Sequence, residues 1–394
     1  MKICHVITRM IVGGAQENTL LSLRGHTENN HEAVLVTGPS PGREGELLRR
    51  TELPWVRVVT VKELVRELSP IEDTIAFFKL WKFFRQEKFD VVHTHSSKAG
   101  IIGRLAARAA GVPVVVHTVH GQAFHPYQAA WKNRLYIFLE RIAARCCDRI
   151  FAVAQAMVDQ CVAAGIAPAA KYQVVYSGMD TAAFAAAKRD PELRKRLKIP
   201  PGAIVTATLA RLSPQKGYEF VIPAAEPLLK KHPELHFLII GDGPMFEEFQ
   251  QELVRRGIRD RFHFAGLVDP AEVPSYLAEA DLLWHLSLHE GLPRAVVQAL
   301  AVGIPVVTFY LDGAPEVVID GKTGFTVEPR NADDVSEATE RLLGDPELRY
   351  SCGQAGREMV LRQFDWKRMV AILETEYARL LKSARRHSHP GIPT

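Results

Sequence analysis

The chain has 394 residues, of which 47% are apolar and 24% are charged, and its net charge is +4. This composition excludes a disordered or fibrous protein, and the length predicts two globular domains instead of one. The net charge is too small to indicate nucleic-acid binding, but it is compatible with an anionic ligand or an anionic membrane surface.

The N-terminal residues MKICHVITRM contain a short apolar run and no small-residue cleavage site. We expect a first β-strand there and not a signal peptide. No apolar run approaches the ~20 residues that a membrane-spanning helix needs. The five cysteines include no Cys-x-x-Cys pair. We therefore expect neither a disulfide framework nor a zinc site, and we expect a cytoplasmic location.

Short β-branched runs alternate with amphipathic segments along the whole chain. In the first half, strands are expected at residues 2–8, 33–37, 56–60, 90–95, 112–118 and 149–154, with helices that include Ala99–Ala110 and Lys132–Cys146. In the second half, strands are expected at residues 203–210, 235–241, 262–266, 281–287 and 304–309. This alternation predicts the α/β class, with two Rossmann-like domains whose parallel sheets are covered on both faces.

The composition of the chain also predicts where these domains begin and end. We place an N-terminal domain at residues 1–178, a charged and alanine-rich linker at 179–202, and a C-terminal domain at 203–363. A helical pattern over 364–385 predicts a last helix that packs across the domains, and residues 386–394 are interpreted as a frayed tail. Ligands of open parallel sheets bind outside the carboxyl ends of the strands, so two such domains facing each other would form a cleft.

Two groups of polar residues follow expected strands of the second half. Arg211 and Lys216 lie at one strand–helix junction, where a guanidinium fork and an ammonium group would suit a diphosphate. Glu290 precedes a Gly–Leu–Pro turn, and Pro293 suits the first position of the helix that follows. Amides at that helix start could hold phosphate oxygens, while Glu290 could accept hydrogen bonds from sugar hydroxyls. The alternatives are two solvated surface cations and an ordinary helix start with a favourable acid.

The segment VGGAQENTL, residues 12–20, directly follows the first expected strand. Two glycines at a helix start allow the backbone to approach an anion closely. This short signal also fits a plain tight turn.

Four histidines gather near two strand ends of the first half: His93, His95, His117 and His120. Imidazole is a common metal ligand, but no carboxylate or cysteine accompanies these residues, and we expect no metal. His120, in HTVHG at a strand end, is the best candidate for touching a substrate. His93 and His117 are expected to be core or supporting residues.

The segment IAFFKLWKFFRQEKF, residues 75–89, combines aromatic and basic residues. Such a helix could lie on a membrane surface, but packing of its apolar face on the sheet is the favoured interpretation. Its basic edges could still meet lipid headgroups.

Taken together, these motifs resemble those of the family 4 glycosyltransferases, retaining enzymes of the GT-B fold that use nucleotide-activated sugars. The resemblance runs nearly from end to end. It is carried by GGAQ after the first strand, DVVHTHSSKAGIIGRLAARAAGVPVVVHTVHG (90–121), VVYSGMDTAAF (174–184), ARLSPQKG (210–217), IIGDGP (239–244), AGLVDP (265–270), LHEGLPRAVVQALAVGIPVV (288–307) and DGAPEVVIDGKTGF (312–325).

The resemblance implies a role for each candidate residue. Arg211 and Lys216 look like the pair that binds the donor diphosphate and stabilises the leaving group. Glu290 looks like the acid that contacts the hydroxyls of the donor sugar, and His120 like the histidine beside its reacting carbon. The remaining donor-binding positions that the resemblance implies are Gly14 near the diphosphate, Gly291, Leu292, Pro293 and Arg294 at the helix start, Gln298 near the ribose, and Val268 in the loop that holds the base.

Three positions depart from the family pattern. Gln298 stands where the family generally has a second acid that grips the ribose, Asp312 where a glycine is common, and Ala154 where a serine is frequent. None of them removes the diphosphate pair, so the resemblance still implies an active enzyme. The first departure puts the affinity for the donor in doubt.

The implied reaction is retaining sugar transfer without a metal or a cofactor. Preorganised cations and helix amides would stabilise the charge of the leaving diphosphate. The acceptor hydroxyl would attack on the face from which the diphosphate leaves, and the leaving phosphate would take its proton. Closure of the domains would exclude water and align the acceptor with the donor.

The implied partners are a nucleotide-sugar donor, with UDP favoured over GDP, and a sugar or lipid-linked acceptor in polysaccharide or glycoconjugate assembly. We expect no nucleic acid, and weak association with an anionic membrane surface at its cytoplasmic face. Two alternatives stay open. One is a nucleotide-sugar 2-epimerase of similar fold, which would need acid–base residues around the sugar. The other is a degenerate, non-catalytic homologue that serves as a binding subunit.

Overall fold

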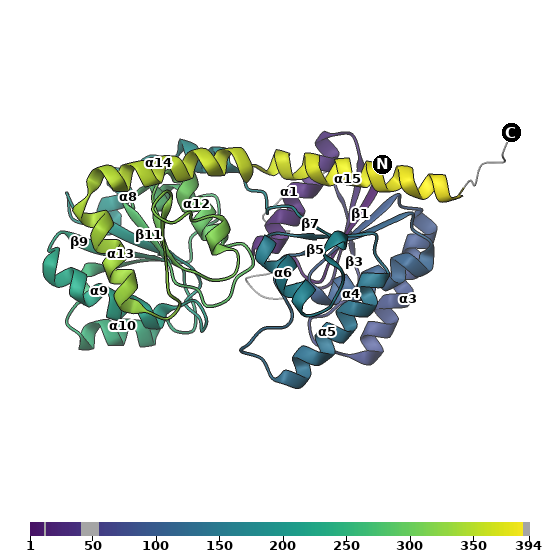
Figure 1. Ribbon diagram of the computed structural model, residues 1–394, viewed down its shortest axis with the longest axis horizontal. Coiled ribbons are helices and arrows are strands. Elements are labelled where there is room, and N and C mark those ends of the chain that lie inside the picture. The colour runs from purple at the N-terminus through teal and green to yellow at the C-terminus, as the bar shows by residue number, and fades with distance from the viewer. Residues whose placement is uncertain (12, 41–54, 389–394) are drawn as a thin grey trace. The chain divides into compact units, whose positions relative to one another are not determined.

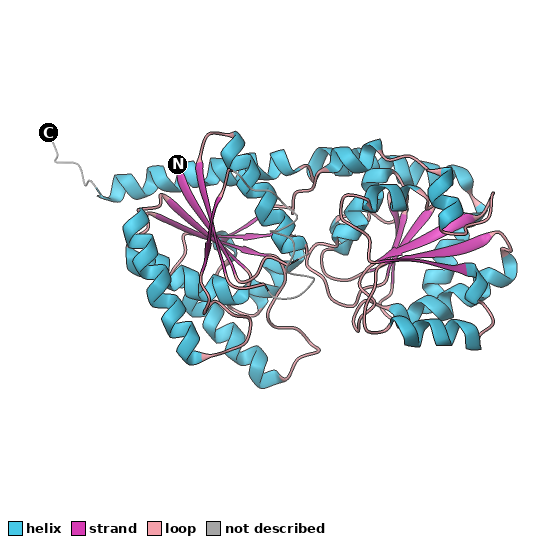
Figure 2. Cartoon of the chain, turned by 180° about the vertical axis from the view of Figure 1, so that it is seen from behind, coloured by secondary structure: helices cyan, strands magenta, loops and turns pink. Residues whose placement is uncertain are grey.

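The computed structural model describes residues 1–11, 13–40 and 55–388. They form two units. The first contains Met1–Met179 together with the C-terminal residues from Trp366 onward, and the second contains Asp180–Asp365. Within each unit, a parallel sheet lies between layers of helices (Figure 2). Both units are therefore Rossmann-like, as the alternation of strands and helices predicts.

The first unit is built on a seven-stranded sheet with the order β3-β2-β1-β4-β5-β6-β7. Its strands are β1 (Lys2–Ile7), β2 (Glu32–Thr37), β3 (Arg57–Thr60), β4 (Val91–His95), β5 (Val114–Val119), β6 (Arg149–Ala152) and β7 (Tyr172–Val174). All of its strand pairs are parallel. The carboxyl ends of β1, β4 and β5, which are neighbours, therefore meet at one edge of the sheet.

The helices of the first unit cover both faces of this sheet. They are α1 (Gly14–Glu28), α3 (Pro70–Glu87), α4 (Ser97–Ala110), α5 (Ala130–Arg145), α6 (Gln155–Ala163) and α15 (Trp366–Ser388). On one face, α15 packs beside α1 (Figure 1). There its residues Trp366 and Met369 share a core with Ile3, Val91 and Val116 of the strands. On the other face, α4 packs on β4 and β5, and it also contacts α3 and α5.

The second unit has a six-stranded parallel sheet with the order β10-β9-β8-β11-β12-β13. Its strands are β8 (Ile204–Leu209), β9 (Leu235–Ile240), β10 (Phe262–Gly266), β11 (Leu282–His285), β12 (Val306–Phe309) and β13 (Gly324–Val327). Its helices are α7 (Thr181–Ala186), α8 (Pro191–Arg196), α9 (Tyr218–Lys231), α10 (Phe246–Arg255), α11 (Val273–Ala278), α12 (Arg294–Val302), α13 (Ala332–Gly344) and α14 (Pro346–Gln363). Fully buried Trp284, Phe237 and Phe309 lie in its core.

The expected linker, residues 179–202, is folded against the second unit. Phe184 of α7 is buried, and α7 contacts α12 and α14. Asp190 caps α8 by accepting a hydrogen bond from the amide of Glu192 at 2.9 Å. The guanidinium of Arg189 lies 2.6 Å from the carboxylate of Asp281. The charged composition of this segment thus reflects ion pairs and caps within one unit.

The expected last helix, residues 364–385, is α15, and it belongs to the first unit. The amide of Trp366 donates to the carbonyl of Met179 at 3.1 Å, and Arg149 pairs with Glu376 at 2.8 Å. The preceding helix, α14, belongs to the second unit. Of the expected frayed tail, residues 389–394 lie outside the described residues, and residues 386–388 continue α15.

Two short strands, β7 and β13, escaped the sequence analysis. β7 has only three residues, and β13 begins at Gly324, where the backbone has φ 150°. A Cβ at this glycine would lie 2.0 Å from the carbonyl oxygen of Val306, so β13 needs a residue that is unusual in strands. None of the described helices combines the length and the apolar character needed to cross a bilayer.

Candidate active site

The loop that follows β8 carries Arg211 and Lys216. Its last residue, Gly217, has φ 74°, and a Cβ there would lie 1.9 Å from the carbonyl oxygen of Leu286. Only glycine fits this position, because it combines a left-handed conformation with a close approach to the chain after β11. The carbonyl of Gln215 also accepts a hydrogen bond from the amide of Leu288 at 2.8 Å. The two loops are therefore held together by backbone contacts.

This junction brings Lys216 and Glu290 into direct contact. The ammonium of Lys216 lies 2.5 Å from Oε1 of Glu290. The amide of Glu290 donates to the carboxylate of Asp312, in the loop after β12, at 2.8 Å. The amide of Gly313 donates to the carbonyl of Gly291 at 3.2 Å. The loops after β8, β11 and β12 thus meet at the carboxyl edge of the second sheet. Arg211, near the start of the loop after β8, is exposed.

The ion pair determines the charge state of this edge. Burial is the largest single influence and would raise the pKa of Glu290. The attraction of Lys216 and His285 and the hydrogen bonds from Lys216 and Ser287 together outweigh it and hold this pKa below its ordinary value. Glu290 is therefore a carboxylate at neutral pH. Burial lowers the pKa of His285, at the end of β11, to about 4. Its neutral ring has Nε2 3.6 Å from Oε1 of Glu290.

Helix α12 begins next to this ion pair. It starts at Arg294, so Pro293 is its N-cap residue and not its first helical residue, a shift of one position from the expectation. Leu292 and Gly291 are buried just before it. Gln298 lies four residues after Arg294 and therefore on the same helix face, where it is half-buried. Within the described part of the chain, no acid accepts a hydrogen bond from its amide.

The loop after β10 contains Val268, which is half-buried. It reaches the same edge through a backbone contact, in which the amide of Gly241 donates to the carbonyl of Gly266 at 2.9 Å. A Cβ at Gly241 would lie 2.0 Å from the carbonyl oxygen of Ala210. The glycine of the IIGDGP motif thus allows the loops after β8, β9 and β10 to approach one another.

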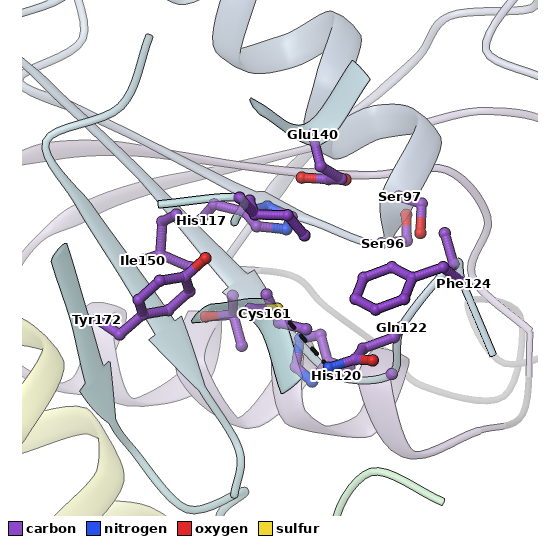
Figure 3. A pocket seen from close by; sticks show the side chains of 15 residues that line it. Ser96, Ser97, His117, His120, Gln122, Phe124, Glu140, Ile150, Cys161 and Tyr172 are labelled. Atoms are coloured by element: carbon purple, nitrogen blue, oxygen red, sulfur yellow. Dashed lines mark hydrogen bonds between the residues drawn. The ribbon is translucent and has the colours of Figure 1, made fainter. Parts of the chain in front are cut away.

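The candidate residues of the first unit lie at the carboxyl edge of its own sheet. Gly14 is the first residue of α1, and Val12 of the same motif lies outside the described residues. His120 directly follows β5. Figure 3 shows His120 on the wall of a pocket together with Ser96, Gln122 and Tyr172. Gly14 and His120 thus both lie just beyond the carboxyl ends of strands, where α/β proteins bind ligands.

The four expected histidines divide between the two faces of the first sheet. His117 lies on the face of α4, where its ring accepts or donates a hydrogen bond with Thr94 at 2.9 Å. His93, His95 and His120 lie on the opposite face. The structure adds His5 of β1 to this group, which the sequence analysis missed, because nothing in the spacing of the residues connects position 5 with position 95.

Within the described residues, His5, His93 and His95 are the only group that places three potential metal ligands together. Five of their six ring nitrogens take part in hydrogen bonds with neighbouring side chains. The sixth, Nε2 of His5, has no partner in the described part of the chain. This arrangement fits a hydrogen-bonded network better than a metal centre, which would need three available nitrogens.

The site of the second unit can therefore bind and stabilise an anion. It offers two cationic side chains, the amides before and within the first turn of α12, and a carboxylate suited to hydroxyl groups. The sequence analysis missed His285 and the role of Asp312 as an acceptor for the amide of Glu290. His285 carried one usable signal, because it lies near the carboxyl end of the expected strand 281–287, and the observed strand β11 ends at it.

Comparison with known proteins identifies the family of this chain. A family model described as "Glycosyltransferase Family 4" matches residues 12–183, and one described as "Glycosyl transferases group 1" matches residues 189–359. An Escherichia coli protein named UDP-Gal:alpha-D-GlcNAc-diphosphoundecaprenol alpha-1,3-galactosyltransferase is 32% identical over 352 residues, which cover 88% of this chain and 89% of that protein. The 2-deoxystreptamine glucosyltransferase of Streptomyces kanamyceticus is 27% identical over 86% of this chain and 92% of its own length.

Solved structures show the same fold. The HepE protein of Anabaena in complex with UDP has a TM-score of 0.80 and 23% identity, with 96% of this chain and all of that chain covered. The sucrose-phosphate synthase of Thermosynechococcus elongatus has a TM-score of 0.80 and 17% identity, with 97% of this chain and all of that chain covered. The relative from Escherichia coli and the two family models agree with this fold, and the chain belongs to the family 4 glycosyltransferases of the GT-B fold.

Proposed function

We propose that the protein transfers a hexosyl group from a nucleotide-sugar, with UDP favoured over GDP, to a hydroxyl of a sugar or lipid-linked acceptor. The names of its relatives support this choice. The Escherichia coli relative is named for a UDP-galactose donor and an acceptor on diphosphoundecaprenol. A relative from Mycolicibacterium smegmatis, 32% identical over 52% of this chain, is named for GDP-mannose and phosphatidylinositol monomannoside. We place the reaction in glycoconjugate or polysaccharide assembly.

The contact between Lys216 and Glu290 is the observation that carries this proposal. It places an ammonium group, the start of α12 and an acid within one junction of three loops. In the complex with donor, Lys216 and Arg211 would bind the diphosphate, and Glu290 would accept hydrogen bonds from the hydroxyls of the sugar. These charges are fixed before the reaction, so they stabilise negative charge that develops on the leaving group.

We propose that transfer retains the configuration of the anomeric carbon and needs no metal ion. The bond between this carbon and the diphosphate oxygen breaks, a bond to the acceptor oxygen forms on the same face, and the acceptor proton passes to the departing phosphate. Cationic side chains take the charge-neutralising part that a divalent ion has in other transferases. His120 would contact the transferred sugar, as the family resemblance implies.

A donor panel tests this function. The purified chain is incubated with UDP- and GDP-sugars, first without acceptor to detect slow release of the nucleoside diphosphate, and then with simple and lipid-linked acceptors. We expect release of the nucleoside diphosphate from one nucleotide class only, and full activity in EDTA. Proton NMR of the product should show the same anomeric configuration as in the donor. Inversion of the linkage, or loss of activity in EDTA that Mg²⁺ restores, would contradict the proposed mechanism.

We further propose that helix α5 of the first unit contacts an anionic lipid surface. Only Ala143 and Ala144 of its 16 residues are fully buried. Trp131, Leu135 and Phe138 recur at the spacing of one helix face, with 63%, 36% and 58% of their surfaces exposed. The helix also carries exposed cations, which are Lys132, Arg134, Arg141 and Arg145.

This combination matches the requirements of a membrane-surface helix. Such helices bury aromatic and aliphatic side chains at the headgroup boundary while lysine and arginine interact with anionic lipid. The segment 75–89, which the sequence analysis singled out, lies in α3. There Ala76, Leu80 and Phe84 are buried in the unit, as the packing interpretation predicts. The opposite face of α3 exposes Ile71, Ile75 and Phe78, by 75%, 40% and 57%. A lipid-linked acceptor would give this surface a function.

A further inference from the structure

Three imidazole rings form a hydrogen-bonded chain at the carboxyl edge of the first sheet. Nδ1 of His5 lies 2.9 Å from Nε2 of His95. Nδ1 of His95 lies 2.9 Å from Nε2 of His120. His5 and His95 are fully buried, and His120 is partly exposed. The planes of the His5 and His95 rings are nearly parallel, with an interplanar angle of 11°. The chain thus leads from the core of the unit to the proposed sugar-binding histidine.

The parallel register of the strands creates this chain. His5 on β1 is paired with His93 on β4, and His95 on β4 is paired with Thr118 on β5. Alternation along the strands places these four side chains on one face of the sheet. His120, two residues beyond Thr118, continues the same face. The chain is therefore fixed by neighbouring core strands and not by a surface loop.

The other histidine of this face stabilises the surroundings of the chain without joining it. Nδ1 of His93 lies 2.5 Å from the hydroxyl of Tyr377 on α15, and its Nε2 lies 2.6 Å from the hydroxyl of Thr118. Its ring centroid is 4.2 Å from that of His95. His93 is thus a close neighbour of His95 in position and burial, but no hydrogen bond links it to His95 or His120 in the described residues.

Both inner rings of the chain are neutral. Burial lowers the pKa of His5 and of His95 well below the ordinary value, and neighbouring histidines lower it further. A neutral imidazole has one N–H donor and one acceptor nitrogen. Two neutral rings in sequence must therefore donate in the same direction, either outward from His5 to His120 or inward from His120 to His5.

The inner end of the chain decides between these two directions. In the inward case, Nε2 of His5 would carry a hydrogen, and this atom is buried without a partner in the described residues. In the outward case, the same atom carries only a lone pair. Buried N–H groups without an acceptor are rarer in proteins than acceptors with an unused lone pair. The outward direction is therefore favoured, with Nε2 of His120 accepting from His95.

We propose that His5 and His95 are positioning residues, which hold His120 in the tautomer that carries its hydrogen on Nδ1. This inference rests on the proposed contact between His120 and the transferred sugar. In this tautomer, Nδ1 of His120 donates a hydrogen bond to an oxygen of the donor or acceptor. The same nitrogen cannot act as a base, because it already carries a hydrogen. The hydrogen bond that one ring nitrogen makes determines the tautomer that the other presents.

The first test needs no substrate. Histidine in the full chain is labelled with ¹⁵N, and two-bond ¹H–¹⁵N spectra report which ring nitrogen of each histidine carries the hydrogen. Signals are assigned with His5→Asn, His95→Asn and His120→Asn. We expect Nδ1 of His120 to be protonated and Nε2 to be unprotonated at neutral pH. The opposite tautomer, or a doubly protonated His120, overturns the inference whatever the activity of the enzyme.

The second test separates hydrogen bonding from packing at position 95. His95→Asn keeps an N–H donor near the place of Nδ1, and His95→Leu keeps volume without any donor. We expect the kcat of His95→Leu to fall about tenfold, the worth of one neutral hydrogen bond, with an unchanged KM for the donor and a mixture of His120 tautomers. The kcat of His95→Asn should stay within about threefold of the unsubstituted enzyme.

His93→Asn is the matched control, because it changes a buried histidine of the same strand that lies outside the chain. It should leave the His120 signals and kcat unchanged. A His95→Leu enzyme with full kcat and a single His120 tautomer would refute the positioning role. His120→Ala with full kcat would instead refute the proposed contact with the sugar, and the tautomer spectra distinguish these two failures.

Discussion

The carboxyl edges of the two sheets carry different kinds of polar side chain. In the second unit, the edge is charged, because Lys216 and Glu290 form an ion pair between loops. In the first unit, the edge carries imidazoles instead, because His95 and His120 are linked ring to ring and burial keeps His5 and His95 uncharged. Both edges come from the same strand–helix architecture. The fold therefore places polar residues at the same edge of each sheet, and the residues at the ends of the strands determine whether an ion pair or a set of imidazoles lies there.

The largest expected effect follows from removing the cation of the charged edge. Lys216→Ala should lower kcat by a hundredfold or more, since one preorganised group that opposes leaving-group charge is lost. Arg211→Ala should act in the same direction. Steady-state kinetics with the preferred donor measure both. Lys230→Ala, at the far and exposed end of α9, should keep normal kinetics. Near-normal turnover in both active-site variants would show that the charge of this edge has no catalytic part.

The lipid-binding proposal for α5 predicts the next largest effect. The full chain should float with phosphatidylglycerol vesicles at low salt and much less with phosphatidylcholine vesicles. A Trp131→Ala, Phe138→Ala double variant should bind at least about tenfold more weakly, because each large side chain contributes about 1.5–3 kcal/mol when fully buried. Tyr350→Ala changes a side chain with similar exposure, 69%, in the second unit and should have no effect. Flotation that is insensitive to lipid charge would contradict the proposal.

Buried His117, on the other face of the first sheet, should make the protein sensitive to acid. Burial, with the nearby charge of Arg104, lowers the pKa of His117 well below its ordinary value. The unfolded chain therefore binds a proton below about pH 6.5 that the folded chain does not bind, so stability is lost as the pH falls. Between about pH 7.5 and about pH 5.5, this one histidine accounts for a loss of about 1.4 kcal/mol.

Urea denaturation of His117→Asn over this pH range measures that contribution. The variant should lose about 1.4 kcal/mol less stability on acidification than the unsubstituted chain. The free energy of unfolding of each protein at about pH 5.5 is compared with its own value at about pH 7.5. The effect of the substitution on packing is present at both pH values and therefore cancels. An unchanged dependence on pH would mean that His117 is not held neutral in the folded unit.

The sequence predicted the charged edge of the second unit more fully than the imidazole edge of the first. Arg211 and Lys216 follow a β-branched run, and Glu290 follows an apolar run. The carboxyl ends of parallel strands meet at one edge, so the approach of these residues could be expected. The imidazole chain depends on which strands are neighbours and on their register. His5 lies in an ordinary core strand, and only the pairing of β1 with β4 brings it near His95.

The same limit applies to the packing of helices. The apolar pattern of α15 predicts a helix, but both units offer apolar surface, and the pattern does not specify which one it covers. The contacts of Trp366 and Glu376 with the first unit settle this point. Similarly, the Ala-rich segment of α7 has only one large apolar residue, Phe184, so its sequence does not reveal that this side chain is buried. Tertiary contacts, not local periodicity, determine these placements.

The smallest expected effect concerns the neutral residue within the charged edge. Gln298 lies on α12, on the face of Arg294, where the family pattern has an acid that grips the ribose. A carboxylate accepts two charge-assisted hydrogen bonds from ribose hydroxyls, whereas the amide accepts with its carbonyl and must donate with its nitrogen. The difference should be about 1–1.5 kcal/mol, close to tenfold in binding. Since the ribose lies away from the reacting carbon, this contact is equally strong in the ground and transition states, and it changes KM without changing kcat.

Gln298→Glu should therefore bind the nucleoside diphosphate several-fold more tightly and turn over at an unchanged rate. The competing expectation is that the site has adapted to the amide through a neighbouring acid, which would repel the new carboxylate. No acid accepts a hydrogen bond from Gln298 in the described residues, which favours tighter binding. Calorimetric titration of both proteins with UDP and GDP measures the change, and Gln298→Leu, which can neither donate nor accept, should bind more weakly than either. Weaker or equal affinity in the glutamate variant would contradict the proposal that position 298 binds the ribose as the family's acid does.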